Sequence, residues 1–168
     1  LRVVFQPKTD AHSGAAVGAE ALARWSHPEY GVIPPDEFIP IAEHTGMIRG
    51  LTLHVLEVAL RECATWRRSG HDLSIAVNVS PLQLKHREFS TQVLQVLARG
   101  TARTVDLDIE ITESMLMNEL EFSTKKLQRL RDAGVRIALD DFGTGFSSLS
   151  RLAKLPIDTL KVDRSFVS

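Results

Sequence analysis

The chain has 168 residues, of which 43% are hydrophobic, and its formal net charge is −1 at pH 7. A chain of this length and composition can bury a sizeable core and is expected to form one domain, and its near-zero charge excludes a general attraction to DNA or to anionic membranes. It contains no apolar run near the roughly 18 residues that indicate a membrane-spanning helix, and no secretory signal is recognisable at its start.

Strands and helices alternate in the hydrophobic pattern of the first half of the chain. Alternation with period two predicts strands, and apolar residues at helical spacing predict helices. We expect strands at 3–6, 17–25 and 74–79, a loop rich in Pro and Gly at 28–35, a helix from Asp36 that ends near Gly46, and a helix at 47–68. The second helix carries Cys63, the single cysteine, which we interpret as an inert buried thiol. One cysteine excludes an intrachain disulfide framework and favours a reducing, cytoplasmic location, although the parent protein could be membrane-anchored.

The second half of the chain continues the same alternation. Ser80 and Pro81 supply a helix N-cap and a first-turn proline. We expect a helix at 81–98 that is broken around His86, a strand at 106–112, a helix at 119–133, a strand at 135–141, a helix at 147–154 and a strand at 158–163. Strands that alternate with helices of this length imply a mostly parallel sheet.

Five of the expected strands place a chemically active side chain on their polar face. Because side chains alternate between the two faces of a strand, the apolar residues of each strand form a row on the opposite face. The expected rows are Ile75/Val77/Val79, Leu107/Ile109/Ile111, Ile137/Leu139 and Leu160/Val162. The polar face carries Asn78, Glu110, Asp140 and Lys161, while Glu20 shares a face with Leu22 and Arg24.

Carboxylates, an amide and an ammonium that converge from different strands make little sense as a plain core. They suit hard divalent cations, which take oxygen ligands, so the pattern predicts a metal-dependent enzyme domain. Asp106 and Asp108 share the parity of Glu110, but the pattern assigns no chemistry to them. Arg67 is expected on a solvated helix face.

The number of contributing strands favours one of the two main α/β arrangements. An open doubly wound sheet gathers its site at one crevice, whereas a barrel gathers residues from the carboxyl ends of many strands. Five contributing strands therefore favour a barrel. A complete eight-stranded barrel has about 200 to 250 residues, so the six expected strands indicate a barrel truncated after about its sixth strand.

Six motifs occur in a fixed order along the chain. They are GAEALARW at 18–25, PPDEFIP at 34–40, NVS at 78–80, EITES at 110–114, DDFGTGFSSL at 140–149 and LKVDRSF at 160–166. Together they resemble the EAL-domain family, the bacterial phosphodiesterases that open cyclic di-GMP. The resemblance spans residues 1–168 and implies a TIM-like (β/α)8 barrel with an antiparallel first strand, of which this chain is roughly the N-terminal two-thirds.

The resemblance also implies a metal site. Glu20, Asn78, Glu110 and Asp140 match the family's ligands of one divalent ion, and Asp140 and Asp141 would hold a second ion. The implied cofactors are Mg²⁺ or Mn²⁺, with Ca²⁺ bound unproductively.

Further residues match family positions around the substrate. Lys161 would orient the attacking water and offset anionic charge, and Arg24, beside Leu22, would pair with a phosphate of the substrate. Glu113 resembles the family residue that steadies the Asp-Asp-Phe-Gly loop.

The implied function is hydrolysis of cyclic di-GMP to linear pGpG. The alternatives are a non-catalytic receptor or protein-interaction module on the same fold, and an unrelated metal-dependent barrel hydrolase. The resemblance also implies a homodimer and upstream sensor or cyclase domains in the parent protein. The family continues with a further strand that carries another metal-binding glutamate, so residues 1–168 alone are expected to lack appreciable activity.

Overall fold

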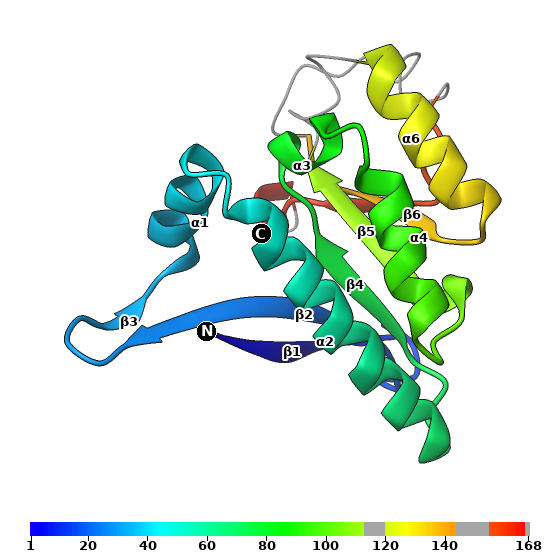
Figure 1. The fold of residues 1–168 in the computed structure, drawn as a ribbon. Coiled ribbons are helices and arrows are strands. Elements are labelled where there is room, and N and C mark those ends of the chain that lie inside the picture. The colour runs from blue at the N-terminus through cyan, green and yellow to red at the C-terminus, as the bar shows by residue number, and fades with distance from the viewer. Residues whose placement is uncertain (113–119, 144–154, 167–168) are drawn as a thin grey trace.

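The computed structural model describes residues 1–112, 120–143 and 155–166. Within them, seven strands form a sheet with the order β1-β2-β4-β5-β6-β7, and β3 pairs with β2 (Figure 1). The strands are β1 (Arg2–Thr9), β2 (Ala16–His27), β3 (Gly31–Ile33), β4 (Ser74–Asn78), β5 (Leu107–Thr112), β6 (Arg136–Phe142) and β7 (Thr159–Val162). β1 runs antiparallel to β2, whereas β2, β4, β5, β6 and β7 are parallel, which confirms the expected mixed α/β fold.

The described helices are α1 (Pro35–His44), α2 (Ile48–Arg68), α3 (Pro81–Lys85), α4 (Phe89–Arg99) and α6 (Leu120–Asp132), with the 3-10 turns η1 (Thr104–Asp106) and η2 (Arg164–Phe166). Most of the described helices lie on one face of this sheet, whereas α1 lies beside the projecting end of β2 (Figure 1). α2 packs against β2 and β4, and α6 packs against β6 (Figure 1). None of the described helices is long and apolar enough to cross a membrane. The helix expected at 147–154 lies outside the described residues.

Local signals account for the interrupted helix after β4. The Ser80 hydroxyl accepts a hydrogen bond from the backbone N–H of Leu82 at 3.2 Å, and Pro81 occupies the first helical position, as predicted. His86 then adopts an extended conformation and separates α3 from α4, which confirms the break. Its Nδ1 accepts a hydrogen bond from the backbone N–H of Glu88, so the histidine caps the turn between the two helices.

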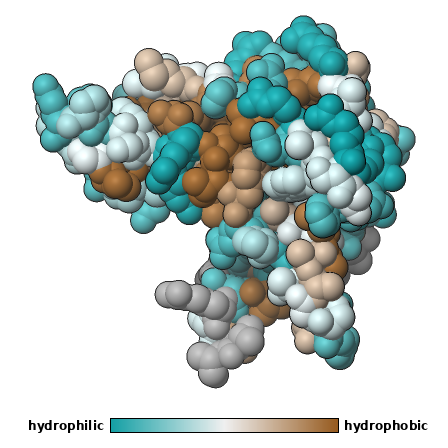
Figure 2. All heavy atoms as spheres, turned by 90° about the horizontal axis from the view of Figure 1, so that it is seen from below, coloured by the Kyte–Doolittle hydropathy of each residue, from teal (hydrophilic) through white to brown (hydrophobic). Residues whose placement is uncertain are grey.

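The loop predicted at 28–35 is wrong in part, because it contains β3. Residues 31–33 pair antiparallel with the end of β2 and form a hairpin whose turn is residues 28–30, and Gly31, the first residue after the turn, has a φ of +70°. A strand of three residues is too short to show the alternation on which the prediction relied. The hairpin and α1 project from the sheet, and Figure 2 shows apolar surface on this lobe and at its junction with the rest of the molecule. The exposed large hydrophobic residues there include Tyr30, Val32, Ile41 and Met47.

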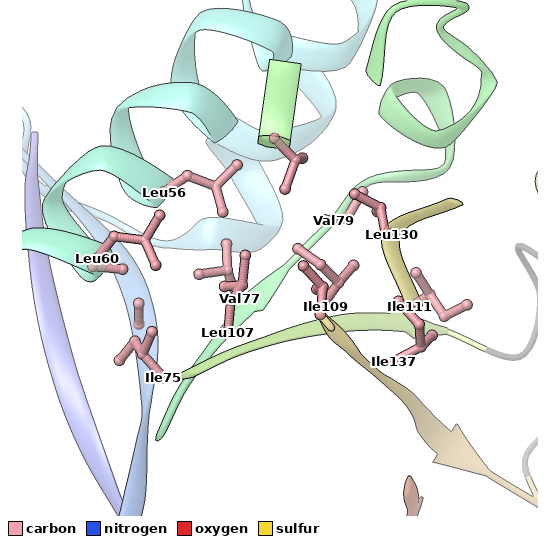
Figure 3. Close-up of a cluster of buried hydrophobic side chains, with 14 of the residues drawn as sticks. Leu56, Leu60, Ile75, Val77, Val79, Leu107, Ile109, Ile111, Leu130 and Ile137 are labelled. Atoms are coloured by element: carbon pink, nitrogen blue, oxygen red, sulfur yellow. The ribbon is translucent and has the colours of Figure 1, made fainter. Parts of the chain in front are cut away.

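The core lies between the sheet and the helices (Figure 3). The expected rows on β4, β5 and β6 are all buried, and Leu56 and Leu60 of α2 pack against them. The fourth expected row behaves differently, since Leu160 and Val162 on β7 are 47% and 55% exposed. Within the described residues, β7 is an edge strand of the sheet, as is β1 at the other end. Leu160 and Val162 are exposed because they lie on this edge.

Gly18 on β2 is required by the close approach of β4. A Cβ atom at this position would lie 2.6 Å from the Ser74 hydroxyl and 2.9 Å from the Ser74 carbonyl oxygen. We expect Gly18→Ala to lower the free energy of unfolding by about 2 kcal/mol, because the added methyl must push strand backbone apart. Denaturant unfolding measures the difference.

Gly50→Ala in α2 is the matched control, because a Cβ atom there meets nothing within 4 Å. This variant should be neutral or gain up to about 1 kcal/mol from the higher helix propensity of alanine. A Gly18→Ala protein as stable as Gly50→Ala would contradict the prediction.

Candidate functional site

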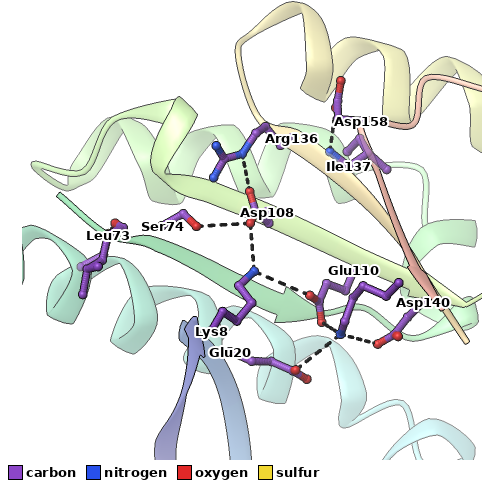
Figure 4. A network of polar contacts seen from close by, with 12 residues as sticks. Lys8, Glu20, Leu73, Ser74, Asp108, Glu110, Arg136, Ile137, Asp140 and Asp158 are labelled. Carbon is purple, nitrogen blue, oxygen red and sulfur yellow. Dashed lines mark hydrogen bonds and ion pairs between the residues drawn. The ribbon is translucent and has the colours of Figure 1, made fainter. Parts of the chain in front are cut away.

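The inner face of the sheet gathers polar side chains from five parallel strands (Figure 4). Glu20 lies in β2, Asn78 ends β4, and Glu110, Asp140 and Lys161 come from β5, β6 and β7. Their register is staggered. Asn78 is level with Glu110, whereas Glu20 is level with residue 76 and Asp140 with residue 112. A staggered parallel sheet that curves toward closure brings such positions together.

Lys161 is the centre of the cluster. Its Nζ donates to Asp140 Oδ2 at 2.6 Å and to Glu110 Oε2 at 2.8 Å, and lies 3.4 Å from Glu20 Oε2. Asn78 Nδ2 donates to the other oxygen of Glu20 at 2.6 Å. The structure thus brings together five side chains that the sequence pattern had placed on the polar face.

Burial and charge act against each other at Lys161. Burial alone would lower the pKa of its ammonium, but the hydrogen bonds to Asp140 and Glu110, with the charges of Glu110 and Glu20, raise the pKa above its usual value. Lys161 therefore stays protonated and offsets the negative charge of the surrounding carboxylates.

Glu110 is the most enclosed member of the cluster. Its side chain is fully buried, and burial raises the pKa of its carboxyl, an effect that the hydrogen bond from Lys161 opposes. Oε1 of Glu110 has no hydrogen-bond partner in the described structure. A buried carboxylate oxygen without a partner is costly, so this atom marks a position where a further donor or a cation would be favourable.

The second aspartate of the Asp-Asp pair lies where β6 is irregular. The ladder between β6 and β7 shifts register between Leu139 and Phe142, and Asp141 has a φ of +55°. A bulge of this kind breaks strict alternation, so adjacent aspartates need not face opposite sides of the sheet. Burial raises the pKa of Asp141, and the charges of Asp140 and Asp163 add to the effect.

The donor set suits a hard divalent cation, since the side chains offer carboxylate and amide oxygens. In their described positions, however, no three acidic, histidine or cysteine side chains of residues 1–112, 120–143 and 155–166 are grouped so that they could hold a metal ion. The carboxylates point at the Lys161 ammonium instead, which supplies the positive charge that their clustering requires. Binding of a metal ion would need these side chains to turn from Lys161 toward the ion.

The two residues predicted to bind substrate line a neighbouring cavity of about 300 Å³. Leu22, Arg24 and Asn78 line it together with apolar side chains of α1 and α2, and Asn78 also belongs to the cluster around Lys161. Arg24 Nη1 donates to the carbonyl oxygen of Ala23 at 2.8 Å, which uses one of its five donors. Glu113 and the part of the DDFGTGFSSL motif from residue 144 onward lie outside the described residues.

Arg67 and Lys8, which lie outside the cluster, have partners that the sequence did not predict. Arg67, predicted on a solvated face, forms an ion pair with the buried carboxylate of Asp106. Asp106 belongs to η1 rather than to β5, so strand parity does not apply to it.

Lys8 of β1 had no predicted role, yet it reaches Asp108 and Glu110 on β5. No local pattern signals this contact, which joins residues about 100 positions apart.

The fold and the site define a class of protein. A parallel α/β sheet with an antiparallel first strand, and with polar side chains gathered on its inner face, is a barrel-type α/β domain with a charged interior site. The chain belongs to the EAL domain family, because the model of that family matches residues 1–168.

Characterised relatives agree with this assignment. The chain is 43% identical over 165 residues to the bifunctional diguanylate cyclase/cyclic di-GMP phosphodiesterase MucR of Pseudomonas aeruginosa, covering 98% of this chain and 24% of MucR. It is 41% identical over 167 residues to the cyclic di-GMP phosphodiesterase PdeR of Escherichia coli, covering 99% of this chain and 25% of PdeR. The chain thus spans about a quarter of the length of these curated relatives.

A solved structure shows the same fold. The PaMucR phosphodiesterase in complex with c-di-GMP superposes with a TM-score of 0.94 at 42% sequence identity. The match covers 99% of this chain and 68% of that chain.

Proposed function

We propose that this chain is a cyclic di-GMP phosphodiesterase domain that uses Mg²⁺ or Mn²⁺ and releases linear pGpG. The observation that carries the proposal is the convergence of Glu20, Glu110 and Asp140 on one partly buried cluster, beside a cavity that Arg24 lines. The names of the relatives MucR and PdeR support the substrate.

Glu20, Asn78, Glu110 and Asp140 are the residues that would hold one divalent ion, and Asp140 and Asp141 would hold a second. Such ions supply Lewis-acid stabilisation of phosphoryl oxygens and a water of lowered pKa. The convergence of Glu20 Oε2, Glu110 Oε2 and Asp140 Oδ2 within 3.4 Å of one point, the Lys161 Nζ, supports this assignment, because hard divalent cations take clustered carboxylate oxygens.

The side chains of the chain have distinct tasks in the proposed reaction. Arg24 pairs with a phosphate through its planar guanidinium, and Leu22 gives the adjacent cavity an apolar wall for a nucleobase. Lys161 remains protonated and stabilises the negative charge that develops as the water oxygen bonds to phosphorus. The P–O3′ bond then breaks, the 3′ oxygen leaves with a proton as a hydroxyl, and the phosphate stays on the 5′ oxygen. Glu113 is proposed to steady the loop after β6.

A non-catalytic receptor for cyclic di-GMP is the second candidate. It is favoured by the ion pairs of Lys161, which supply positive charge to the carboxylates of Glu20, Glu110 and Asp140 without a metal ion. In that case the cavity beside Arg24 would bind the dinucleotide and the cluster would serve only to hold the strands together.

Metal removal separates the two candidates. In the full natural protein, we expect exhaustive chelation to abolish the conversion of cyclic di-GMP to pGpG, followed by chromatography of the nucleotides. Mg²⁺ or Mn²⁺ should restore turnover, and Ca²⁺ should not, because its longer and more flexible coordination does not support the reaction geometry. Hydrolysis that persists unchanged after chelation would contradict the metal assignment. Binding of cyclic di-GMP without turnover under every metal condition would establish the receptor.

The surroundings of the domain form part of the same proposal. We propose a homodimer in the cytoplasm, with sensor or cyclase domains attached upstream. The name of MucR, which joins a diguanylate cyclase to a phosphodiesterase, supports an attached cyclase domain.

A further inference from the structure

A second group of polar side chains lies on the inner face of the sheet, beside the cluster around Lys161. We call it the floor network, and it consists of Lys8 of β1, Ser74 of β4, Asp108 of β5 and Arg136 of β6 (Figure 4). Asp108 is its centre. It accepts hydrogen bonds from Arg136 Nε at 2.6 Å, from Lys8 Nζ at 3.1 Å and from the Ser74 hydroxyl at 3.4 Å. The proposed reaction uses none of these residues.

Lys8 reaches Asp108 by crossing two intervening strands. Lys8 pairs with Gly18 in the β1–β2 ladder, Gly18 pairs with Ser74 in the β2–β4 ladder, and Asp108 lies on β5 beyond them. Both positions along this path carry small residues. A Cβ atom on Gly18 would lie 3.3 Å from Lys8 Cε, so the absence of a side chain there leaves room for the lysine. The small residues at these two positions therefore allow the long side chain of Lys8 to extend across the inner face of the sheet.

Lys8 also faces the carboxylate of Glu110. Its Nζ lies 4.0 Å from Glu110 Oε1, the buried oxygen that has no hydrogen-bond partner. The other oxygen of the same carboxylate accepts the hydrogen bond from Lys161 at 2.8 Å. Each oxygen of Glu110 thus has one lysine facing it, and Figure 4 shows the Lys8 ammonium joined by dashed lines to both Asp108 and Glu110.

We infer that Lys8 is a positioning residue: its ammonium, 4.0 Å from Glu110 Oε1, attracts that oxygen and thereby keeps Oε2 on the side of Glu20, Asp140 and Lys161, where the proposed ion would bind. The inference rests on the proposed function, since it assigns Lys8 a role toward the proposed ion. Asp108 anchors the Lys8 ammonium through the hydrogen bond of 3.1 Å and offsets its charge, so Lys8 presents a fixed ammonium to Glu110 while adding little repulsion toward a cation. Groups that orient a metal-binding carboxylate contribute about 10- to 100-fold to metal affinity.

The test is a calorimetric titration of the full natural protein with Mn²⁺ alone. We expect Lys8→Met to weaken Mn²⁺ binding about tenfold. Asp108 keeps its bonds from Arg136 and Ser74 in this variant, so the protein should fold. If Lys8→Met does not fold, the double variant Lys8→Met/Asp108→Asn removes the buried carboxylate charge together with its partner, and the same tenfold loss is expected.

Arg136→Met is the matched control. It also removes an ion pair to Asp108, and Arg136 belongs to the same floor network, but among the described residues Arg136 forms its ion pair with Asp108 and not with Glu110. A merely structural role of that network would make both variants lose Mn²⁺ affinity equally, which would overturn the inference. Unchanged affinity in Lys8→Met would overturn it too, while leaving the proposed function intact. A wild-type protein that binds no Mn²⁺ would refute the proposed function and the inference together.

Discussion

Replacing Lys161 by methionine is expected to destabilise the protein and to abolish most of its turnover. Lys161 is the cation that Asp140, Glu110 and Glu20 share, and its side chain is 28% exposed. Breaking such a partly buried ion pair leaves clustered carboxylates uncompensated, at a cost of about 2 kcal/mol in the free energy of unfolding. Denaturant unfolding in the presence of a chelator measures this loss.

The loss should depend on pH and on metal. The pKa of Lys161 is raised by its partners, so its stabilising contribution is present at neutral pH and lost only as the pH rises through that raised pKa. The difference between variant and wild type should also shrink as the pH falls and Glu110, whose carboxyl pKa is raised by burial, takes up a proton. Mn²⁺ should restore stability to Lys161→Met by neutralising the carboxylates, without restoring turnover.

Lys125→Met, at an exposed lysine of α6, is the matched control and should change neither stability nor turnover. If Lys161→Met were as stable as Lys125→Met in chelator at neutral pH, the assignment of Lys161 as the shared cation would be wrong.

Glu20→Ala should reduce turnover of cyclic di-GMP by about 10³-fold, because a lost metal ligand removes several kcal/mol of transition-state stabilisation. The effect on folding should be smaller, since Glu20 is only partly buried and contacts Lys161 at 3.4 Å, the longest of the three distances. Turnover and calorimetric binding of cyclic di-GMP, measured on the same samples, separate chemistry from substrate binding.

Glu20→Gln sharpens this test. The amide keeps the size of the side chain and an oxygen that can accept the hydrogen bond from Asn78, but it removes the negative charge. We expect turnover to fall nearly as far as in Glu20→Ala, because the charge is what binds a cation. Turnover within tenfold of wild type in both variants would show that Glu20 is not a ligand.

Much of the local structure can be read from the sequence. Alternation with period two predicts β4, β5 and β6 and the face on which Asn78, Glu110 and Asp140 lie, because adjacent side chains of a strand must point to opposite sides. The N-cap at Ser80 and the break at His86 are also local, since each depends on side chains that bond to backbone groups nearby. β3 escaped prediction because three residues carry too little pattern.

The distances within the site were decided only by the tertiary structure. Lys161 and Glu20 are 141 positions apart, and Lys8 and Asp108 are 100 apart, so their contacts depend on strand order, register and the curvature of the sheet. Periodicity determines the face of a side chain but not which strand lies beside it. The sequence by itself therefore identified the residues on the polar faces of the strands, which form the charged cluster. The order of its motifs identified the family of the chain. The central position of Lys161 and the reach of Lys8 across Gly18 emerged only when the strands were assembled, because both depend on the spacing between strands that are far apart in the sequence.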